Sequence, residues 1–222
     1  FALKEEHARE ALEYARPGEV AEGNVGGGTG MICHEFKGGI GTSSRVVGAA
    51  MHTYTVGVLV QANYGSRGDL RVDGVPVGRH IGNEEVPSPW EQDRSQGSII
   101  IVVATDAPLI SDQCRRFARR AAIGLARVGG VAHNGSGDIF LAFSTANHHP
   151  QGHRGAYELK SLPPNHLDAL FGAVISSTEE AILNALCAAE TMTGFKGRIA
   201  HALPLGRVVQ LLETYRQLAA PG

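Results

Sequence analysis

Residues 97–105 read GSIIIVVAT, a run of β-branched and apolar side chains that begins directly after a glycine and a serine. The run follows residues 81–97 (IGNEEVPSPWEQDRSQG), which are polar and show no apolar period. The length and composition of the apolar run at 98–105 are typical of a buried strand. The sequence therefore predicts a long polar loop that leads straight into a core strand whose first residue is Ser98.

The segments on either side of this strand mix further strands with helices. Residues 54–63 (YTVGVLVQAN) are almost continuously apolar, which predicts a strand buried on both faces. Residues 165–189 predict a helix broken near 176–177, where Ser177 and Glu180 have the spacing of a capping box. The other predicted elements are helices at 3–16, 111–128 and 206–219, strands at 31–36, 43–50 and 139–144, and a hairpin or edge strand at 69–79. Strands gathered early and helices gathered late favour an α+β fold.

The composition excludes several classes of protein. The chain has 222 residues, 43 % of them hydrophobic, and a formal net charge of −2, which excludes intrinsic disorder. Its 29 glycines are close to twice the average share, but they follow no collagen period. No apolar run reaches the ~20 residues that a membrane-spanning helix needs. The three cysteines are far apart and form no C-x-x-C pair, so we expect a reducing, cytoplasmic location without disulfides.

Three features suggest binding functions, and each has a plainer alternative. Residues 26–30 (GGGTG) could cradle a phosphate, but they lack the G-x-x-x-x-G-K-[ST] motif and precede a strand, which favours a turn. Arg115, Arg116, Arg119 and Arg120 could bind nucleic acid, but the balanced net charge favours a solvated helix face. His148, His149 and His153 could ligate a metal, but they lie in a Pro/Gly-bearing loop without an H-E-x-x-H helix. We therefore expect no metal, organic cofactor, nucleic acid or membrane partner.

The junction between Gly97 and Ser98 has two interpretations. A glycine and serine at the border of a loop and a strand commonly form only a turn. If the bond between them were cut, however, the new α-amine would lie on the residue that carries the hydroxyl. The unperturbed pKa of an α-amine, ~7.7–8.0, suits a general base at working pH, and an N-terminal amine of this kind can activate a nucleophile. A glycine before the serine would leave the scissile carbonyl sterically open.

Four blocks of sequence resemble one family, in that family's order. They are residues 23–31 (GNVGGGTGM), 37–44 (KGGIGTSS), 97–109 (GSIIIVVATDAPL) and 134–147 (NGSGDIFLAFSTAN). They are similar to the L-aminopeptidase/D-esterase and β-peptidyl aminopeptidase family, the DmpA and BapA type. The resemblance implies a self-processing N-terminal-nucleophile-like serine peptidase whose inactive precursor cuts itself between Gly97 and Ser98.

The resemblance also implies roles for four catalytic residues. Ser98 would attack the substrate carbonyl and form an acyl-enzyme, with its own α-amine as the general base. Ser136 and Asp138 would orient the nucleophile and the amine. Asn63 would donate a hydrogen bond to the oxyanion. The plainer alternatives are that residues 63–65 end a strand in a turn and that Asn134-Gly135 is an ordinary turn dipeptide.

The fold expected from the resemblance is an α+β, four-layer αββα sandwich of two stacked sheets flanked by helices. We expect one domain over residues 1–222, N-terminally incomplete relative to the family, which autoproteolysis divides into 1–97 and 98–222. The expected substrates are short peptides, amino-acid amides or esters, and a homo-oligomer is expected. Two alternatives remain: an acyltransferase of the ornithine acetyltransferase kind, which typically uses threonine, and an inactive, unprocessed fragment that acts as a structural or binding protein.

Overall fold

The computed structural model describes residues 3–90, 97–148, 151–152 and 154–219. Its centre is a four-stranded sheet in the order β3-β4-β5-β6. These strands are β3 (Ile40–Ala49), β4 (His52–Asn63), β5 (Ser98–Thr105) and β6 (Ile139–Ser144). β3, β4 and β5 are antiparallel neighbours, whereas β6 runs parallel to β5. The predicted strand that starts at Ser98 is confirmed, and it is one of the two central strands.

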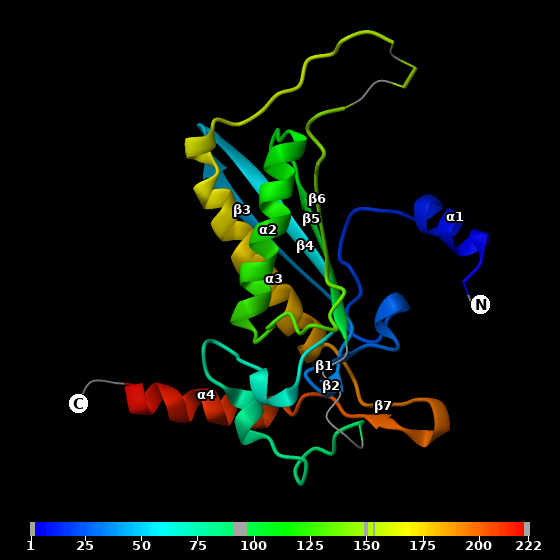
Figure 1. Ribbon diagram of the computed structural model, residues 1–222, viewed down its shortest axis with the longest axis vertical. Coiled ribbons are helices and arrows are strands. Elements are labelled where there is room, and N and C mark those ends of the chain that lie inside the picture. Colours follow the sequence, from blue (N-terminus) through cyan, green and yellow to red (C-terminus); the bar gives the residue numbers. More distant parts are fainter. Residues whose placement is uncertain (1–2, 91–96, 149–150, 153, 220–222) are drawn as a thin grey trace.

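Two long helices cover one face of this sheet (Figure 1). α2 (Ser111–Arg127) is the crossover that makes the parallel β5–β6 pair possible, and α3 (Asp168–Cys187) packs beside it against β3 and β4. The Phe117 and Phe171 rings join the two helices in an edge-to-face contact with centroids 5.5 Å apart. The backbone of β3 approaches α3 closely, because a Cβ at Gly41 would lie 1.9 Å from the carbonyl oxygen of Ala181.

The two faces of the sheet differ in burial. Val56, Val58, Val60 and Ala62 point toward the helices and are buried, while the alternate residues of β4 are only half-buried. The prediction that residues 54–63 are buried on both faces is therefore wrong within the described residues, because the helices lie on one face. Apolar side chains also occupy the other face, where Val46, Ile100, Ile139, Leu141 and Phe143 are exposed.

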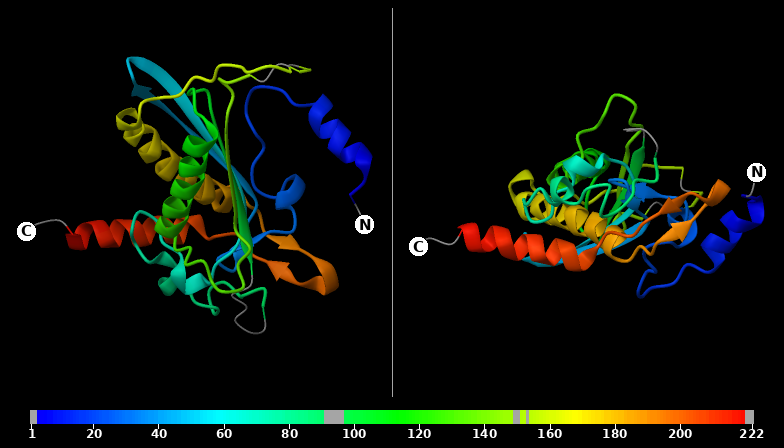
Figure 2. Two further views of the ribbon diagram at one scale, coloured as in Figure 1. Left: turned by 45° about the horizontal axis from the view of Figure 1, so that its top comes forward. Right: turned by 90° about the horizontal axis from the view of Figure 1, so that it is seen from below.

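The α+β class is confirmed. Of the four expected layers, the described residues form one sheet layer with one helix layer against it (Figure 2). α1 (Glu5–Glu13) stands away from the sheet and has no buried residue. α4 (Leu205–Ala219) extends sideways from the end of the sheet where β5 begins, and contacts the short helix at Val77–His80.

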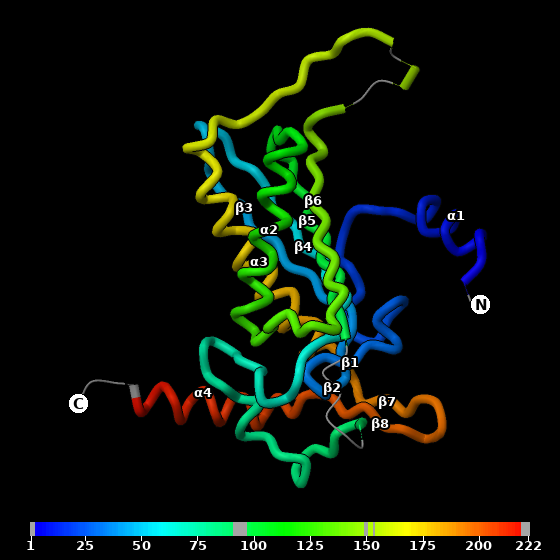
Figure 3. Tube along the Cα trace, in the orientation of Figure 1, coloured from blue at the N-terminus to red at the C-terminus, as the bar shows by residue number. Residues whose placement is uncertain are grey.

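Two small hairpins lie near that same end of the sheet (Figure 3). One joins β1 (Ile32–Cys33) to β2 (Phe36–Lys37), and the other joins β7 (Met192–Thr193) to β8 (Ile199–Ala200). The predicted continuous strand at 31–36 is wrong, because the chain reverses at His34 and Glu35, both of which have positive φ. The backbone N–H of Lys37 donates to the carbonyl of His201 at 2.6 Å, which connects the first hairpin to the segment after β8.

The predicted break near residues 176–177 does not occur, and α3 is continuous. Ser176 donates its hydroxyl hydrogen to the carbonyl of Ala173 in the preceding turn, and Ser177 is buried within the helix, so neither residue caps a new helix. Within the described residues, α3 is also the one helix long and apolar enough to span a membrane, but 56 % of its apolar 18-residue stretch is buried, as in a core helix. The remaining short helices are Gly26–Gly28, Arg67–Asp69, Pro164–His166 and Phe195–Gly197.

Candidate active site

Sheet topology brings the end of β4 to the beginnings of β5 and β6. β4 is antiparallel to β5, so Asn63, the last residue of β4, lies directly opposite Ser98, the first residue of β5. β6 is parallel to β5, so the turn that precedes β6 reaches the same end of the sheet. This turn carries Ser136 and Asp138. All four predicted catalytic residues therefore meet at one end of the sheet.

Asn63 and Ser98 are paired across the sheet, and paired residues of neighbouring strands point to the same face. The pairing Asn63–Ser98 is followed by Ala62–Ile99, whose side chains are buried against the helices. The side chains of Asn63 and Ser98 therefore point to the opposite face, away from the helices. Both residues are partly exposed.

The Ser98 hydroxyl is held by the turn before β6. The backbone N–H of Gly137 donates to Ser98 Oγ at 2.8 Å, and the turn itself is closed by a bond from the Ser136 N–H to the His133 carbonyl at 2.7 Å. Because the Gly137 N–H supplies a hydrogen to Oγ, the hydroxyl's own hydrogen remains available for a different acceptor.

Asp138 connects the turn to β5. One of its carboxylate oxygens, Oδ1, accepts the Ser136 hydroxyl hydrogen at 2.5 Å and the Ile99 backbone N–H at 3.1 Å. The peptide that carries the Ile99 N–H also carries the carbonyl of Ser98, so the carboxylate fixes the backbone of the nucleophile's own residue. Ser136 and Asp138 thus form one hydrogen-bonded unit beside Ser98.

The Asn63 amide is oriented by a backbone donor. The N–H of Ile32 in β1 donates to Asn63 Oδ1 at 3.0 Å, and this bond assigns the oxygen and nitrogen of the side chain. Within the described part of the chain, Nδ2 has no hydrogen-bond acceptor, so its two hydrogens are available to a ligand. An amide that presents a free N–H₂ group can stabilise a developing oxyanion.

Gly97 lies in tight contact with the end of β4. A Cβ at this position would lie 2.1 Å from the carbonyl oxygen of Asn63 and 3.1 Å from Cα of Tyr64. A side chain at residue 97 would therefore displace the backbone of the Gly97–Ser98 junction from its present place beside Asn63.

Sequence reasoning missed three contributors to the site. Gly137 and Ile32 act through backbone N–H groups, which any residue type except proline provides, so no residue pattern signals them. Tyr64 follows Asn63 and is buried, and together with Gly97, Ser136 and Asp138 it lines a cavity of about 10 Å³. Burial, reinforced by the nearby Cys33 and Asp138, raises the pKa of the Tyr64 hydroxyl well above its usual range.

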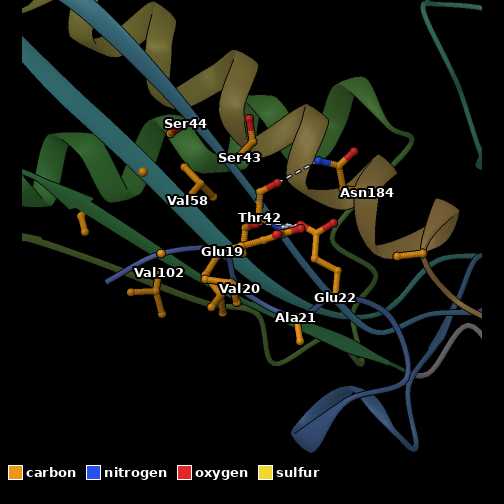
Figure 4. Close-up of a pocket in the computed structure, with 15 residues that line it drawn as sticks. Glu19, Val20, Ala21, Glu22, Thr42, Ser43, Ser44, Val58, Val102 and Asn184 are labelled. Carbon is orange, nitrogen blue, oxygen red and sulfur yellow. Dashed lines mark hydrogen bonds between the residues drawn. The ribbon is translucent and has the colours of Figure 1, made fainter. Parts of the chain in front are cut away.

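A much larger cavity, of about 960 Å³, opens on the face of the sheet away from the helices (Figure 4). Residues 18–22 cross this face, and the Glu22 carboxylate accepts both the backbone N–H of Thr42 at 2.6 Å and its hydroxyl at 2.7 Å. Leu59, Val102 and Ala104 contribute to the lining. The side chains of Asn63 and Ser98 point to this same face, so the cavity and the candidate site share one side of the sheet.

The plainer alternatives account for two of the other features. The N–H groups of Gly28 and Thr29 are bonded within the glycine-rich turn, to the carbonyls of Val25 and Gly26, which favours a turn over a phosphate cradle. Arg120 lies 4.1 Å above the centroid of the Phe171 ring, which it covers as part of a helix face.

The structure describes one of the three histidines that were considered as metal ligands. Across residues 3–90, 97–148, 151–152 and 154–219 no group of three or more histidine, cysteine or acidic residues is placed to hold a metal. Of the three histidines considered, His148 is described, whereas His149 and His153 lie outside the described residues.

Comparisons with known proteins match this chain to one family. The model of peptidase family S58 matches residues 1–200. Two proteins called β-peptidyl aminopeptidase BapA are similar over nearly the whole chain. The one from Sphingosinicella microcystinivorans is 47 % identical over 99 % of this chain and 58 % of its own length, and the one from Sphingosinicella xenopeptidilytica is 43 % identical over 95 % and 55 %.

Solved structures agree with these sequence matches. The L-aminopeptidase D-Ala-esterase/amidase of Ochrobactrum anthropi, described as a variant of the Ntn hydrolase fold, superposes with a TM-score of 0.88 at 45 % identity, over 99 % of this chain and 60 % of that one. A β-aminopeptidase from a Burkholderia species gives 0.85 at 48 % identity, over 100 % and 61 %. The chain spans a little over half the length of the curated relatives it matches.

Proposed function

This chain belongs to peptidase family S58, and from that premise we propose that it is a self-processing serine aminopeptidase with Ser98 as its nucleophile. Its substrates would be short peptides, amino-acid amides or esters, from which it releases the N-terminal residue. The observation that carries the proposal is the pairing of Asn63 with Ser98, which places a side-chain amide, whose N–H₂ group has no acceptor among the described residues, beside a hydroxyl at the start of a core strand.

Self-cleavage uses the carbonyl of Gly97 as the first electrophile. Ser98 Oγ attacks this carbon, the Gly97–Ser98 C–N bond breaks, and the proton lost by the hydroxyl moves to the departing nitrogen. Water then hydrolyses the resulting ester, which releases the Gly97 carboxylate and restores the hydroxyl. The products are residues 1–97 and a chain that begins with the free α-amine of Ser98.

Turnover repeats the same chemistry on a substrate. The free α-amine of Ser98 takes the hydroxyl proton as Oγ attacks the first carbonyl of the substrate, and the ammonium returns that proton to the leaving amine. The acyl group remains on Oγ as an ester until the amine activates a water molecule. During both attacks Asn63 Nδ2 would donate a hydrogen bond to the negative oxygen.

The remaining groups hold the nucleophile in place. The Gly137 N–H fixes Oγ from one side, which leaves the hydroxyl hydrogen free to point toward the amine. The Ser136–Asp138 unit fixes the peptide between Ser98 and Ile99 and supplies negative charge near the amine. That charge would favour the ammonium form through which the proton passes.

Covalent trapping tests the proposal. The protein is mixed with an amino-acid ester, quenched in acid and digested, and the peptides are measured by mass spectrometry. We expect the acyl group on the peptide that begins at Ser98, and none when Ser98→Ala is treated in the same way. An acyl group on another side chain, or turnover by Ser98→Ala at the wild-type rate, would overturn the proposal.

A further inference from the structure

Lys37 is a buried cation that the proposed chemistry does not use. Its residue is 2 % exposed, and within the described residues its ammonium group bonds to backbone carbonyls and forms no ion pair with a carboxylate. Placing an ammonium group in a protein interior carries a large desolvation cost unless its hydrogens are satisfied. A buried lysine without an acidic partner therefore requires an explanation.

The ammonium donates to three backbone carbonyls. Lys37 Nζ lies 2.9 Å from the oxygen of Gly28, 2.9 Å from that of Met31 and 2.6 Å from that of Gly38. An ammonium group has three hydrogens, so this set uses all of them. Although Lys37 lines a cavity of about 350 Å³, its donors are already engaged and none remains for a ligand there.

One of these carbonyls belongs to the peptide that orients Asn63. The Met31 carbonyl and the Ile32 N–H are the two polar ends of a single planar peptide group. At its oxygen end, this peptide accepts hydrogen bonds from Lys37 Nζ and from the Gly38 N–H at 3.0 Å. At its nitrogen end, it donates to Asn63 Oδ1 at 3.0 Å.

The position of this peptide controls the direction of the Asn63 amide. A cation at the carbonyl end polarises the peptide and strengthens the hydrogen bond made by its N–H. The rigid peptide plane transmits any displacement of the oxygen to the N–H. The N–H in turn holds Oδ1 by its hydrogen bond, which fixes the direction in which Nδ2 presents its hydrogens.

We propose that Lys37 is a positioning residue for the reaction, acting through the Met31–Ile32 peptide to hold Asn63 as the oxyanion donor. The inference rests on the proposed function, because it gives Lys37 a purpose only if Asn63 stabilises the oxyanion. Lys37 itself does not touch the substrate. Its effect is therefore on kcat, through the transition state, and little on KM.

Burial lowers the pKa of the Lys37 ammonium to about 8. A neutral amine has two hydrogens, so one of the three carbonyl bonds is lost above that pH. In the β1–β2 hairpin that carries Lys37 and in the β7–β8 hairpin beside it, the other ionisable groups are Cys33, His34, Glu35, Lys196 and Arg198, and His201 follows β8. None of these contributes a charge effect to the shift of Lys37, whose cause is desolvation.

A double-mutant cycle tests the inference. We would measure kcat and KM for hydrolysis of an amino-acid p-nitroanilide by the wild type, Lys37→Met, Asn63→Ala and the double variant. Alone, Lys37→Met should lower kcat about 10-fold to 100-fold, the range expected for a charge-assisted hydrogen bond, with KM within about twofold. In the Asn63→Ala background the same change should alter kcat less than about twofold. Equal losses in both backgrounds would overturn the inference, because they would mean that Lys37 does not act through Asn63.

The controls separate this inference from the proposed function and from misfolding. Exposed Lys160→Met should leave kcat unchanged. If Asn63→Ala itself keeps wild-type kcat, the proposed function fails; if Asn63→Ala is impaired while Lys37→Met is fully active, only the inference about Lys37 fails.

A second measurement needs no substitution at Lys37. In the wild type, kcat should fall as pH rises through about 8, and Asn63→Ala should lack this alkaline limb. The same limb in both proteins would contradict the inference.

Discussion

Asn63 and Ser98 lie directly opposite each other in the antiparallel pairing of β4 and β5, with their side chains on the face away from the helices. The last residue of one core strand and the first residue of the next are therefore held by the sheet's own hydrogen bonds. Residues on strands are positioned more rigidly than residues on loops, which suits an oxyanion donor and a nucleophile.

Replacing Asn63 by alanine removes the proposed oxyanion donor. Loss of one such donor typically costs about 2.7–4 kcal/mol, so kcat for amide hydrolysis should fall roughly 10²-fold to 10³-fold while KM changes little. Steady-state kinetics on an amino-acid p-nitroanilide provide the measurement. Exposed Asn165→Ala is the matched control, and an Asn63→Ala enzyme as fast as this control would rule out the oxyanion role.

Replacing Gly97 by alanine should slow self-cleavage. The new Cβ would lie 2.1 Å from the Asn63 carbonyl oxygen, so the Gly97–Ser98 junction must shift away from its present position. The rate is followed by the disappearance of the intact chain on denaturing gels. Gly30→Ala is the control, because a Cβ there meets nothing within 4 Å, and equal cleavage rates for the two variants would show that the contact is irrelevant.

Asp138 and Ser136 should behave as one unit. Asp138→Asn removes the charge that holds Ser136 Oγ and the Ile99 N–H, and we expect both cleavage and turnover to fall about tenfold or more. Adding Ser136→Ala to this variant should cost less than Ser136→Ala costs alone, because the two side chains share one bond. If the losses of activity caused by the two substitutions are strictly additive in free energy, Ser136 and Asp138 do not act as one unit. Exposed Asp73→Asn serves as the control.

Titration of Lys37 should make the unfolding free energy depend on pH. Its pKa is about 8 in the folded protein, against ~10.4 for an unperturbed lysine. Between these values the unfolded chain binds a proton that the folded chain does not, so the unfolding free energy rises with pH. The charged form thus destabilises the fold below pH 8, and that penalty is relieved as pH approaches 10.5.

The size of this effect is set by the same shift. Denaturant unfolding should be measured at several pH values between about 8 and 10.4. Across this range the unfolding free energy of the wild type should rise by up to about 3 kcal/mol relative to that of Lys37→Met. Lys160→Met should follow the wild type. Parallel pH curves for wild type and Lys37→Met would show that Lys37 does not titrate in this range.

Part of the fold and of the site could be predicted because it depends on the local composition of the sequence. The run from Ser98 to Thr105 has the composition of a core strand, and its predicted bounds are those of β5. The roles of Ser98, Asn63, Ser136 and Asp138 came from resemblance to a family, and the structure adds that they meet at one end of the sheet. The reversal at His34 and Glu35 was missed because neither residue is a usual turn former, and their positive φ depends on tertiary contacts.

Backbone hydrogen bonds and contacts between distant segments could not be predicted from patterns of residue types. The Gly137 N–H on Ser98 and the Met31–Ile32 peptide between Lys37 and Asn63 depend on where the backbone lies, not on side-chain type. Within the described residues, the half-buried face of β4 differs from the prediction for a related reason. An apolar strand signals that its side chains can be buried, whereas the covering layer is a property of the whole fold.

The most direct test of the account is the mass and N-terminal sequence of the purified protein. Self-cleavage predicts two chains, of which one begins Ser-Ile-Ile-Ile, and Ser98→Ala should give a single species of 23.4 kDa. A wild-type protein that remains intact at 23.4 kDa, or a Ser98→Ala protein that still divides between residues 97 and 98, would contradict it.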